Sequence, residues 1–250
     1  MEVENKDLEW LDFDILANYP DVIGKVFLRH GGTSTGAFNS LNLSDSVGDH
    51  PDNVKVNRSF IQKNMRVDNL VFAKQEHGIK IIEIDRNNFL NFKVADGLYT
   101  KEKDIGLAVT HADCQAAIFF DKENQIIGIA HAGWRGIIGN IYSKMVENFL
   151  REGSQIDNIL VSISPSICFQ HSEFKNYKKD FPKKYWAFQK DHYLFDFWDI
   201  AESQLLDLGI KRENIEISKI CTYCNPKDYY SYRRDKITGR HATVVAIKSK

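Results

Sequence analysis

Short runs rich in Ile, Val and Phe recur along the chain, and their length and residue types predict strands. The predicted strands are 24–28, 81–84, 106–110, 116–120, 126–131, 159–164, 215–220 and 242–247. Three of them, between 106 and 131, follow one another through short turns such as 121–124. This order departs from a regular strand-helix alternation and favours a mixed sheet.

Three other segments carry apolar residues at helical spacing. The first begins near His50 and Pro51, because the fixed φ of proline suits a first helical position. The second is predicted over 137–150, with Gly153 as its stop, and the third over 199–208, closed by Gly209. The apolar positions are Val54, Phe60, Ile61 and Met65 in the first, and Ile137, Ile138, Ile141, Met145, Val146 and Phe149 in the second. Helices packed outside a mixed sheet give an α+β architecture.

Length and composition indicate an ordinary globular chain. It has 250 residues and shows no linker, repeat or low-complexity tract, so residues 1–250 are predicted to form a single domain. The formal net charge of −1 gives no bulk attraction to nucleic acid or to a membrane surface, and neither is expected as a partner.

Features of the N-terminus and of the cysteines predict a cytoplasmic location. The stretch MEVENKDLEWLDFDI is acidic and lacks the basic start and apolar centre of a secretory signal, and apolar runs such as 126–132 are too short to cross a bilayer. Without export, cysteines are reduced thiols or metal ligands rather than disulfides. The four cysteines are Cys114, Cys168, Cys221 and Cys224.

Three phrases place a metal-ligand side chain near the end of a predicted strand. They are Gln75-Glu76-His77-Gly78, Ala112-Asp113-Cys114 and Ala130-His131-Ala132-Gly133-Trp134-Arg135-Gly136. The three side chains are much farther apart in sequence than the paired ligands of a zinc finger, which stand about two to five residues apart. Ligands gathered by tertiary structure instead suit a catalytic zinc with an open position, held by His77, Cys114 and His131.

Other interpretations of these residues exist. A lone histidine near a strand end is more often a hydrogen-bonded structural residue, and a lone cysteine is more often a small buried hydrophobe. His111 is a competing ligand, but on a continued strand it would face away from Cys114. Cys221-Thr-Tyr-Cys224 has no second CxxC or ordered histidine pair, so two packed thiols are expected there. His171 and His192 are left unassigned.

Several arginines are candidates for binding an anion. Arg29 lies in Arg29-His30-Gly31-Gly32, and Arg135 lies just before a predicted helix, where backbone N–H groups favour phosphate. Tyr232-Arg233-Arg234-Asp235 and Thr238-Gly239-Arg240 supply further guanidinium groups. Surface ion pairing is the commoner fate of arginine, and the chain contains no GxxxxGK[ST] phosphate loop.

Taken together, these phrases resemble the YfiH/laccase-domain family, also called the YfiH/FAMIN, polyphenol oxidase or peptidoglycan editing factor family. The resemblance runs from about Lys25 to Ile247. It includes Arg29-x-Gly-Gly-x-Ser34, Ser40-Leu-Asn-Leu43, Val47-Gly-Asp49 with Asn57-Arg58, Gln75-x-His-Gly78, Ala95-Asp-Gly97, Ala112-Asp-Cys114, His131-Ala-Gly-Trp-Arg-Gly136, Cys221-Thr-Tyr223, Ser231-Tyr-Arg-Arg234 and Thr238-Gly-Arg240.

The resemblance implies a four-layer α/β/β/α fold with mixed sheets and one catalytic zinc bound by His77, Cys114 and His131. It also implies that Asn42 lines the pocket, and that purine nucleosides and phosphate are the small-molecule partners. The expected reactions are phosphorolysis of adenosine, inosine and methylthioadenosine, and deamination of adenosine. His111 and Gln115-Ala116 depart from the family pattern beside the metal, which leaves the preferred substrate open.

These implications assign roles to named residues. A catalytic zinc can lower the pKa of water to about 7. Arg29 and Arg135 are expected to bind phosphate, and Asp113 either supports Cys114 or carries a proton.

Three alternatives compete with the nucleoside enzyme. Copper binds such ligands more tightly than zinc, so a copper-dependent polyphenol oxidase is chemically allowed, although eight histidines without a His-x-His pair do not suit a multicopper centre. Cys114 and His131 could instead form the nucleophile-base pair of a hydrolase or amidase acting on peptidoglycan precursors. A binding module without catalysis is the third alternative.

Overall fold

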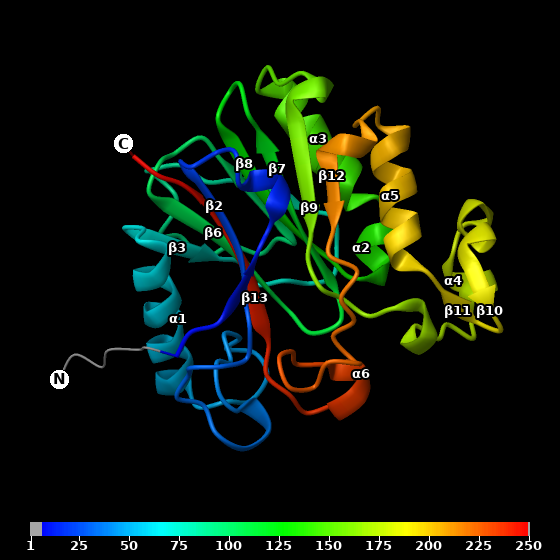
Figure 1. The fold of residues 1–250 in the computed structure, drawn as a ribbon, viewed down its shortest axis with the longest axis horizontal. Coiled ribbons are helices and arrows are strands. Elements are labelled where there is room, and N and C mark those ends of the chain that lie inside the picture. Colours follow the sequence, from blue (N-terminus) through cyan, green and yellow to red (C-terminus); the bar gives the residue numbers. More distant parts are fainter. Residues whose placement is uncertain (1–6, 250) are drawn as a thin grey trace.

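Two mixed β-sheets lie face to face, and helices cover the outer face of each (Figure 1). The computed structural model describes residues 7–249; the first part of the acidic N-terminal stretch, residues 1–6, lies outside the described residues. The five-stranded sheet has the order β1-β2-β13-β6-β3, and the six-stranded sheet has the order β12-β9-β7-β8-β5-β4. This confirms the predicted mixed-sheet architecture with outer helices.

The strands of the two sheets are short, as their sequence runs predicted. The first sheet contains β1 Trp10–Asp12, β2 Val22–Phe27, β3 Asn69–Phe72, β6 Ile105–His111 and β13 His241–Ile247. The second contains β4 Ile81–Glu83, β5 Gly97–Thr100, β7 Gln115–Asp121, β8 Ile126–Ala132, β9 Ile159–Ile163 and β12 Ile215–Ile217. A separate two-stranded ribbon is formed by β10 Gln189–Asp191 and β11 Leu194–Phe195. Each of the eight predicted strands overlaps an observed strand.

Three apolar cores fill the spaces between the four layers. Consecutive strand residues point to opposite faces. Phe120 of β7 therefore packs between the sheets, while Phe119 packs under the helices. On the other side, Ile61 of helix α1 (Pro51–Met65) packs against Phe27 of β2. Because the middle core joins both sheets, we infer that the described residues form one folding unit.

Helix α1 begins at Pro51 as predicted, but the second predicted helix is wrong as a single element. The chain forms α2 Trp134–Ile138 and α3 Ile141–Arg151, separated at Gly139 and Asn140. Asn140 has a left-handed backbone (φ 59°), and its side chain accepts a hydrogen bond from Ser143 N, so it begins a new helix. The sequence did not reveal this break, because apolar residues continue at helical spacing on both sides of it.

The third predicted helix is α5 Phe197–Asp207, which begins two residues earlier than expected. Its start is fixed by Asp196, whose carboxylate accepts hydrogen bonds from the backbone N–H groups of Trp198 and Asp199. The remaining short helices are α4 Tyr177–Asp180 and α6 Tyr232–Asp235. The 3₁₀ segments are 14–16, 36–38, 156–158, 169–171, 183–188 and 212–214.

The three central strands do not share one sheet, which their succession along the sequence did not reveal. Strand β6 belongs to the five-stranded sheet, whereas β7 and β8 belong to the six-stranded sheet. The turn 112–114 therefore carries the chain from one sheet to the other. The 121–124 turn does join β7 and β8 as expected, since Asp121 Oδ1 accepts hydrogen bonds from the N–H groups of Glu123 and Asn124.

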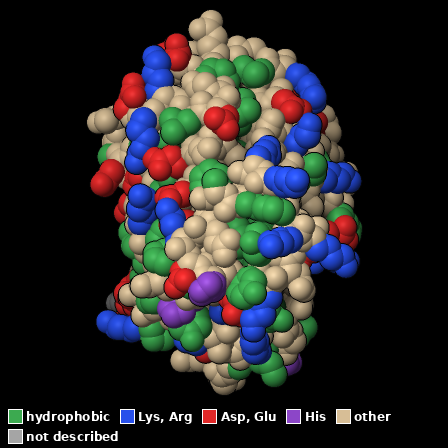
Figure 2. Space-filling model, turned by 90° about the vertical axis from the view of Figure 1, so that its right-hand side faces the viewer, with side chains coloured by type: hydrophobic (Ala, Val, Ile, Leu, Met, Phe, Trp, Pro, Cys, Tyr) green, Lys and Arg blue, Asp and Glu red, His purple; other side chains and the backbone are tan. Residues whose placement is uncertain are grey.

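Residues 172–196 extend to one side of the sheets and carry α4, β10 and β11 (Figure 1). On the face that includes this side of the molecule, Lys and Arg side chains are spread beside Asp and Glu (Figure 2). Within residues 7–249, no helix has the length and apolar character needed to span a membrane.

Candidate metal centre and active site

His77, Cys114 and His131 meet where the chain passes between the two sheets. His77 lies in the connection from β3 to β4, and Cys114 in the connection from β6 to β7, and both connections cross from the five-stranded to the six-stranded sheet. His131 lies on β8, opposite Ala116 of β7. One ligand atom from each of the three side chains lies within 4.8 Å of the others. The sequence separations are therefore bridged by the two crossovers.

Unusual backbone geometry surrounds this triad. His77 (φ 59°) and Asp113 (φ 91°) both adopt the left-handed region, which is uncommon for residues other than glycine and is concentrated at functional sites. Gly133 lies two residues after His131 in the sequence. A Cβ atom at Gly133 would lie 2.9 Å from His77 Cδ2 and 3.2 Å from Cys114 Sγ. Glycine is thus required here by close approach to two of the three ligands.

A buried carboxylate, Asp96, lies behind the triad and was not assigned a role from the sequence. Its Oδ1 accepts hydrogen bonds from His131 Nδ1 and from His77 N, both at 2.9 Å. Its Oδ2 accepts from Gly78 N at 2.7 Å. With Nδ1 donating to Asp96, Nε2 of His131 is left free to bind a metal, the arrangement in which an outer carboxylate fixes a liganding imidazole. Burial raises the pKa of Asp96, but these hydrogen bonds outweigh it and lower the pKa below its usual value.

Cys114 and His131 shift each other's protonation. Burial raises the pKa of the Cys114 thiol, but the neighbouring His131 and His77 outweigh it and lower that pKa to about 6. Burial lowers the pKa of His131, but the Cys114 thiolate and Asp96 outweigh it and raise that pKa to about 9. Without a metal, the pair is therefore a thiolate and an imidazolium at neutral pH. A thiolate is the form in which cysteine binds a metal.

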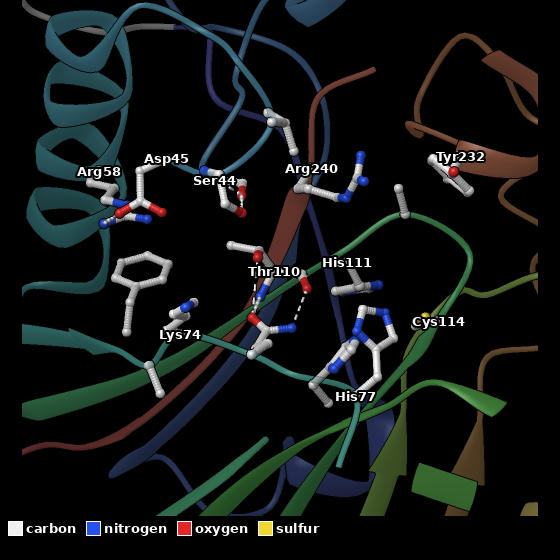
Figure 3. A pocket seen from close by; sticks show the side chains of 17 residues that line it. Ser44, Asp45, Arg58, Lys74, His77, Thr110, His111, Cys114, Tyr232 and Arg240 are labelled. Atoms are coloured by element: carbon white, nitrogen blue, oxygen red, sulfur yellow. Dashed lines mark hydrogen bonds and ion pairs between the residues drawn. The ribbon is translucent and has the colours of Figure 1, made fainter. Parts of the chain in front are cut away.

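Two cavities meet at the triad, with volumes of about 420 and 380 Å³. Both are lined by His77, Cys114 and Tyr232. In the first cavity, His77 and Cys114 lie at one end and Arg58 and Asp45 at the other (Figure 3). The triad is thus accessible from two sides, as a reaction between two substrates would require.

The two cavities differ in their walls. The first carries the cations Arg58, Lys74 and Arg240 and the carboxylate of Asp45. The second carries four aromatic rings, those of Trp134, Phe174, Phe197 and Tyr232. It also carries the cations Arg135, Arg233 and Lys236. Both cavities can therefore hold an anionic group, and the second has more of the large aromatic side chains on which a flat ring can stack.

The first cavity holds a half-buried arginine, Arg240, near the triad. Burial lowers the pKa of Arg240, while Cys114 and Asp113 raise it, and arginine stays charged in proteins. Its Nη1 donates to the carbonyl oxygens of Thr238 and Gly239 at 2.9 Å. Arg58 is held by Asp45 at 3.4 Å and by the Leu43 carbonyl. Arg240 is consequently a fixed positive charge beside the thiolate.

Two residues assigned to substrate from the sequence line neither of these cavities. The Arg29 guanidinium donates to the carbonyl oxygens of Asn39 and Pro226 and lies over the Tyr230 ring. Asn42 is fully buried, and its Oδ1 accepts from Arg240 N at 2.9 Å. The structure therefore places Arg29 and Asn42, expected to bind phosphate and to line the pocket, outside the walls of these two cavities. Arg29 links the loops of Asn39 and Pro226 through its hydrogen bonds, and Asn42 holds the backbone N–H of Arg240.

The other two sequence-predicted residues do line the second cavity. Arg135 is exposed, with its guanidinium 4.1 Å from the Trp134 ring. The Asp113 carboxylate has a structural role, since it accepts hydrogen bonds from Thr222 Oγ1 at 2.8 Å and from Arg233 N at 2.6 Å. Asp113 thus fixes the turn that presents Cys114.

The residues that depart from the family pattern are tied to neighbouring strands and helices. His111 lines the first cavity, and its Nε2 lies 2.8 Å from Thr243 Oγ1. Its ring centroid lies 4.2 Å from that of His241. Gln115 receives a hydrogen bond from the Tyr142 hydroxyl and donates to the Phe197 carbonyl at 2.9 Å. His111 is therefore a neighbour of the triad and lies outside the ligand cluster.

Cys221 and Cys224, expected to be a pair of packed thiols, have further metal-ligand side chains beside them. Cys168 and His171 lie beside them, and the ligand atoms of Cys168, His171 and Cys224 are within 4.8 Å of one another. Cys168 and His171 are separated by two residues, as are Cys221 and Cys224. That mixed Cys-x-x-His pair was the available signal, and the search for a second CxxC missed it.

The triad has the donors of a zinc site. Two imidazole nitrogens and one thiolate suit zinc with a fourth position open, and Asp96 supplies the outer carboxylate that such histidines usually have. Copper accepts the same donors. The fold and site together define a laccase-domain chain with one candidate catalytic metal centre.

Comparison with known proteins agrees with this class. Residues 25–248 match the family described as "Multi-copper polyphenol oxidoreductase laccase", and the chain belongs to this family. Similar proteins include "Purine nucleoside phosphorylase YlmD" of Bacillus subtilis, 31% identical over 92% of this chain and 90% of that protein. Another is "Purine nucleoside phosphorylase YfiH" of Escherichia coli, 31% identical over 87% of this chain and 90% of that protein.

Solved structures share the fold. YlmD from Geobacillus stearothermophilus has a TM-score of 0.87 and 28% identity, covering 100% of this chain and 98% of that one. A Bacillus licheniformis protein described as hypothetical protein YfiH has the same TM-score and identity, over 96% of each chain. The YfiH-type fold expected from the sequence is therefore confirmed, and the curated relatives carry the names of enzymes.

Proposed function

We propose that this protein is a zinc-dependent purine nucleoside phosphorylase acting on adenosine, inosine and methylthioadenosine. The single observation that carries the proposal is the meeting of His77, Cys114 and His131 at the junction of two cavities, each with cations in its wall. Phosphorolysis needs a nucleoside and a phosphate on opposite sides of one reacting carbon, which two joined cavities can provide. The names of the similar proteins support the same activity.

The second cavity is proposed to hold the purine. The rings of Trp134, Phe174 and Phe197 supply flat apolar faces, and stacking on such rings is a general way to hold a base. Ser166 and Ser172 add hydroxyl groups to the same wall. The ribose would then lie toward Cys114, which lines both cavities.

The first cavity is proposed to hold the phosphate on Arg240. Phosphate oxygen attacks the anomeric carbon as the bond to the purine nitrogen breaks, so the anion must be fixed close to the triad. Arg240 is half-buried near Cys114, whereas Arg135 is exposed over Trp134. Arg135, which lines the second cavity, is the proposed phosphate contact for the opposite arrangement of the two substrates.

A bound zinc ion would supply Lewis-acid chemistry at the triad, while the protein supplies ligands, orientation and charge. Asp96 holds His131 Nδ1–H so that Nε2 faces the other ligands. Asp113 holds the Cys114 turn through Thr222 and Arg233. Arg240 places a fixed positive charge beside the reacting group.

Adenosine deamination is proposed as a second activity of the same centre. Cys114 is only half-buried, and both cavities reach it, so water has access to the triad. The two reactions differ in their products, because deamination yields inosine and ammonia and needs no phosphate. Inosine formed from adenosine in phosphate-free buffer, and lost in Cys114→Ser, would support it.

The test of the main proposal is base release from inosine, adenosine and methylthioadenosine by zinc-loaded protein, with and without phosphate. Release is expected only with phosphate. Arg240→Gln is expected to raise the KM for phosphate about tenfold or more, as loss of a charge-assisted bond predicts. Arg135→Gln is the matched variant from the other cavity. A larger effect of Arg135→Gln would reverse the assignment of the two cavities.

Two further activities are separable in the same assay. Phenol oxidation that appears with copper, with no nucleoside turnover by the zinc form, would favour an oxidase. The thiolate–imidazolium pair of Cys114 and His131 also resembles an activated cysteine nucleophile. Activity that survives a strong chelator but not a thiol alkylator would favour a hydrolase.

The four free thiols fit the proposed cytoplasmic location.

A further inference from the structure

A second cluster of metal-ligand side chains lies in two neighbouring loops. Strands β9 and β12 pair in parallel, so the segments that follow them leave the sheet at the same edge. The loops that follow run side by side. Ser166 N donates to the Ile220 carbonyl, and Thr222 N donates to the Ser166 carbonyl, both at 3.1 Å. The parallel sheet pairing therefore continues into the loops that carry the cluster.

Each loop contributes two ligands separated by two residues. The first brings Cys168 and His171, and the second brings Cys221 and Cys224. Ligand atoms of Cys168, His171 and Cys224 lie within 4.8 Å of one another. Two such pairs, one from each of two loops, are the arrangement of structural zinc sites, and Cys₃His is one of their usual ligand sets.

The fourth ligand, Cys221, lies against the same group. Its Sγ accepts a hydrogen bond from Cys168 N at 3.4 Å. N–H groups directed at sulfur favour the thiolate, which is the form that binds metal. Cys168 and Cys221 are both buried, so the inner half of the cluster is shielded from water.

His171 is oriented toward the sulfur atoms. Its Nε2 lies 3.2 Å from Cys224 Sγ, and its ring is stacked on Tyr223 with centroids 3.8 Å apart. Tetrahedral zinc with Zn–S bonds of about 2.3 Å sets sulfur atoms about 3.8 Å apart. The ligand atoms of Cys168, His171 and Cys224, all within 4.8 Å of one another, therefore need only small shifts to surround one ion.

We propose that Cys168, His171, Cys221 and Cys224 form a closed structural zinc site, separate from the His77–Cys114–His131 triad. A disulfide between two of the thiols would leave the third thiol and the directed imidazole without a role. Four protein ligands leave no position for substrate, so this site is structural rather than catalytic.

The proposed ion would brace the wall of the active site. Ser166, Ile167 and Ser172 of the first loop line the second cavity. Thr222, next to Cys221, donates to Asp113 Oδ1 at 2.8 Å, and Asp113 precedes Cys114. Joining the two loops thus fixes both the cavity wall and the support of the Cys114 turn.

Zinc content per chain tests the proposal without reference to activity. Protein purified without chelator is expected to hold about two zinc ions per chain, Cys114→Ser about one, and Cys114→Ser combined with His171→Ala and Cys224→Ser none. His192→Ala, at an exposed histidine outside the cluster, is the matched control and should leave two. Zinc that is unchanged by His171→Ala with Cys224→Ser in the folded protein would overturn the site.

Cobalt substitution in the Cys114→Ser background provides a second readout. The remaining Co²⁺ should show tetrahedral d–d bands and sulfur-to-metal charge-transfer absorption of three thiolates, lowered in Cys224→Ser to that of two. Circular dichroism checks that each variant is folded. Denaturing alkylation without reductant, after chelation, should modify all four wild-type cysteines. Modification of two, with the mass of a disulfide, would also overturn the proposal.

Because the cluster and the triad lose zinc through different variants, the two assignments fail separately. Loss of zinc only in Cys114→Ser would retain the catalytic centre and reject the structural site. Loss only in the His171→Ala and Cys224→Ser variant would do the reverse.

Discussion

The Asp96 carboxylate binds His131 Nδ1 and the backbone N–H of His77 through one oxygen atom. One buried group therefore orients two of the three candidate metal ligands, although His77 lies in the β3–β4 connection and His131 lies on β8. This relationship explains how a loop residue, His77, can be fixed relative to a strand residue, His131.

Asp96→Asn is expected to weaken zinc binding at the triad about 10- to 100-fold, the usual effect of losing an outer-shell partner. The amide cannot accept all of the hydrogen bonds that the carboxylate accepts. Competition with a chromophoric chelator measures the affinity. Asp121→Asn is the matched control, because Asp121 is also buried and accepts backbone hydrogen bonds, but in the β7–β8 turn. Equal zinc affinity in the two variants would contradict the role of Asp96.

Gly133→Ala is expected to lower zinc affinity and activity more than it lowers stability. The added Cβ would press on His77 Cδ2 and Cys114 Sγ at 2.9 and 3.2 Å, and both must move. Gly24→Ala is the comparison, since its Cβ would meet Leu16 Cδ1 at 2.6 Å in the core between the sheets. That variant should unfold at a lower temperature and keep its zinc. Full zinc affinity in Gly133→Ala would contradict the close approach.

Zinc binding to the metal-free triad should release about one proton between about pH 6 and about pH 9. In this range Cys114 is already a thiolate, because its pKa is lowered to about 6, while His131 is still protonated, because its pKa is raised to about 9. Zinc requires both to be deprotonated, so apparent affinity should rise about tenfold per pH unit up to about pH 9. Calorimetry in buffers of different ionisation enthalpy, using a variant lacking the second cluster, counts the protons. Affinity independent of pH in this range would contradict the thiolate–imidazolium pair.

His241→Phe is expected to reduce the loss of stability in acid. Burial, with Arg240 and Arg29, lowers the pKa of His241 to about 3, so the folded state binds its proton only below that pH. An unfolded histidine binds a proton below about pH 6.5. As the pH falls from about 6.5 to about 3, His241 should therefore lower the free energy of unfolding by about 1.4 kcal/mol per pH unit. This part of the decrease should be absent in His241→Phe.

Urea unfolding of the metal-free proteins at several pH values measures this difference. His192→Phe, at an exposed site, should keep the wild-type slope. An identical slope in His241→Phe would show that His241 is not buried in its neutral form.

Local sequence patterns predicted much of this structure, and the misses have physical causes. Runs of Ile, Val and Phe marked strands, but an apolar run does not specify its partner, so the division of β6 from β7 and β8 was not visible. Gly139 and Asn140 interrupt the second helix without disturbing its apolar periodicity. Helix α1 was predicted well because Pro51 is a local start signal.

The candidate site was predictable where side-chain chemistry alone suggests a metal ligand. His77, Cys114 and His131 could be selected in this way. Asp96 could not, because its role depends on a contact with His131 that only the folded chain makes. Arg29 was assigned to phosphate from its glycine-rich surroundings, but its guanidinium is used by carbonyl groups of distant loops.

The most direct test is ³¹P NMR of zinc-loaded wild-type protein with inosine and phosphate, alongside Cys114→Ser. One ribose 1-phosphate should form for each hypoxanthine released, and neither product should form with the variant. Hypoxanthine accompanied by free ribose, with phosphate unconsumed, or full turnover by Cys114→Ser, would contradict a metal-centred phosphorylase.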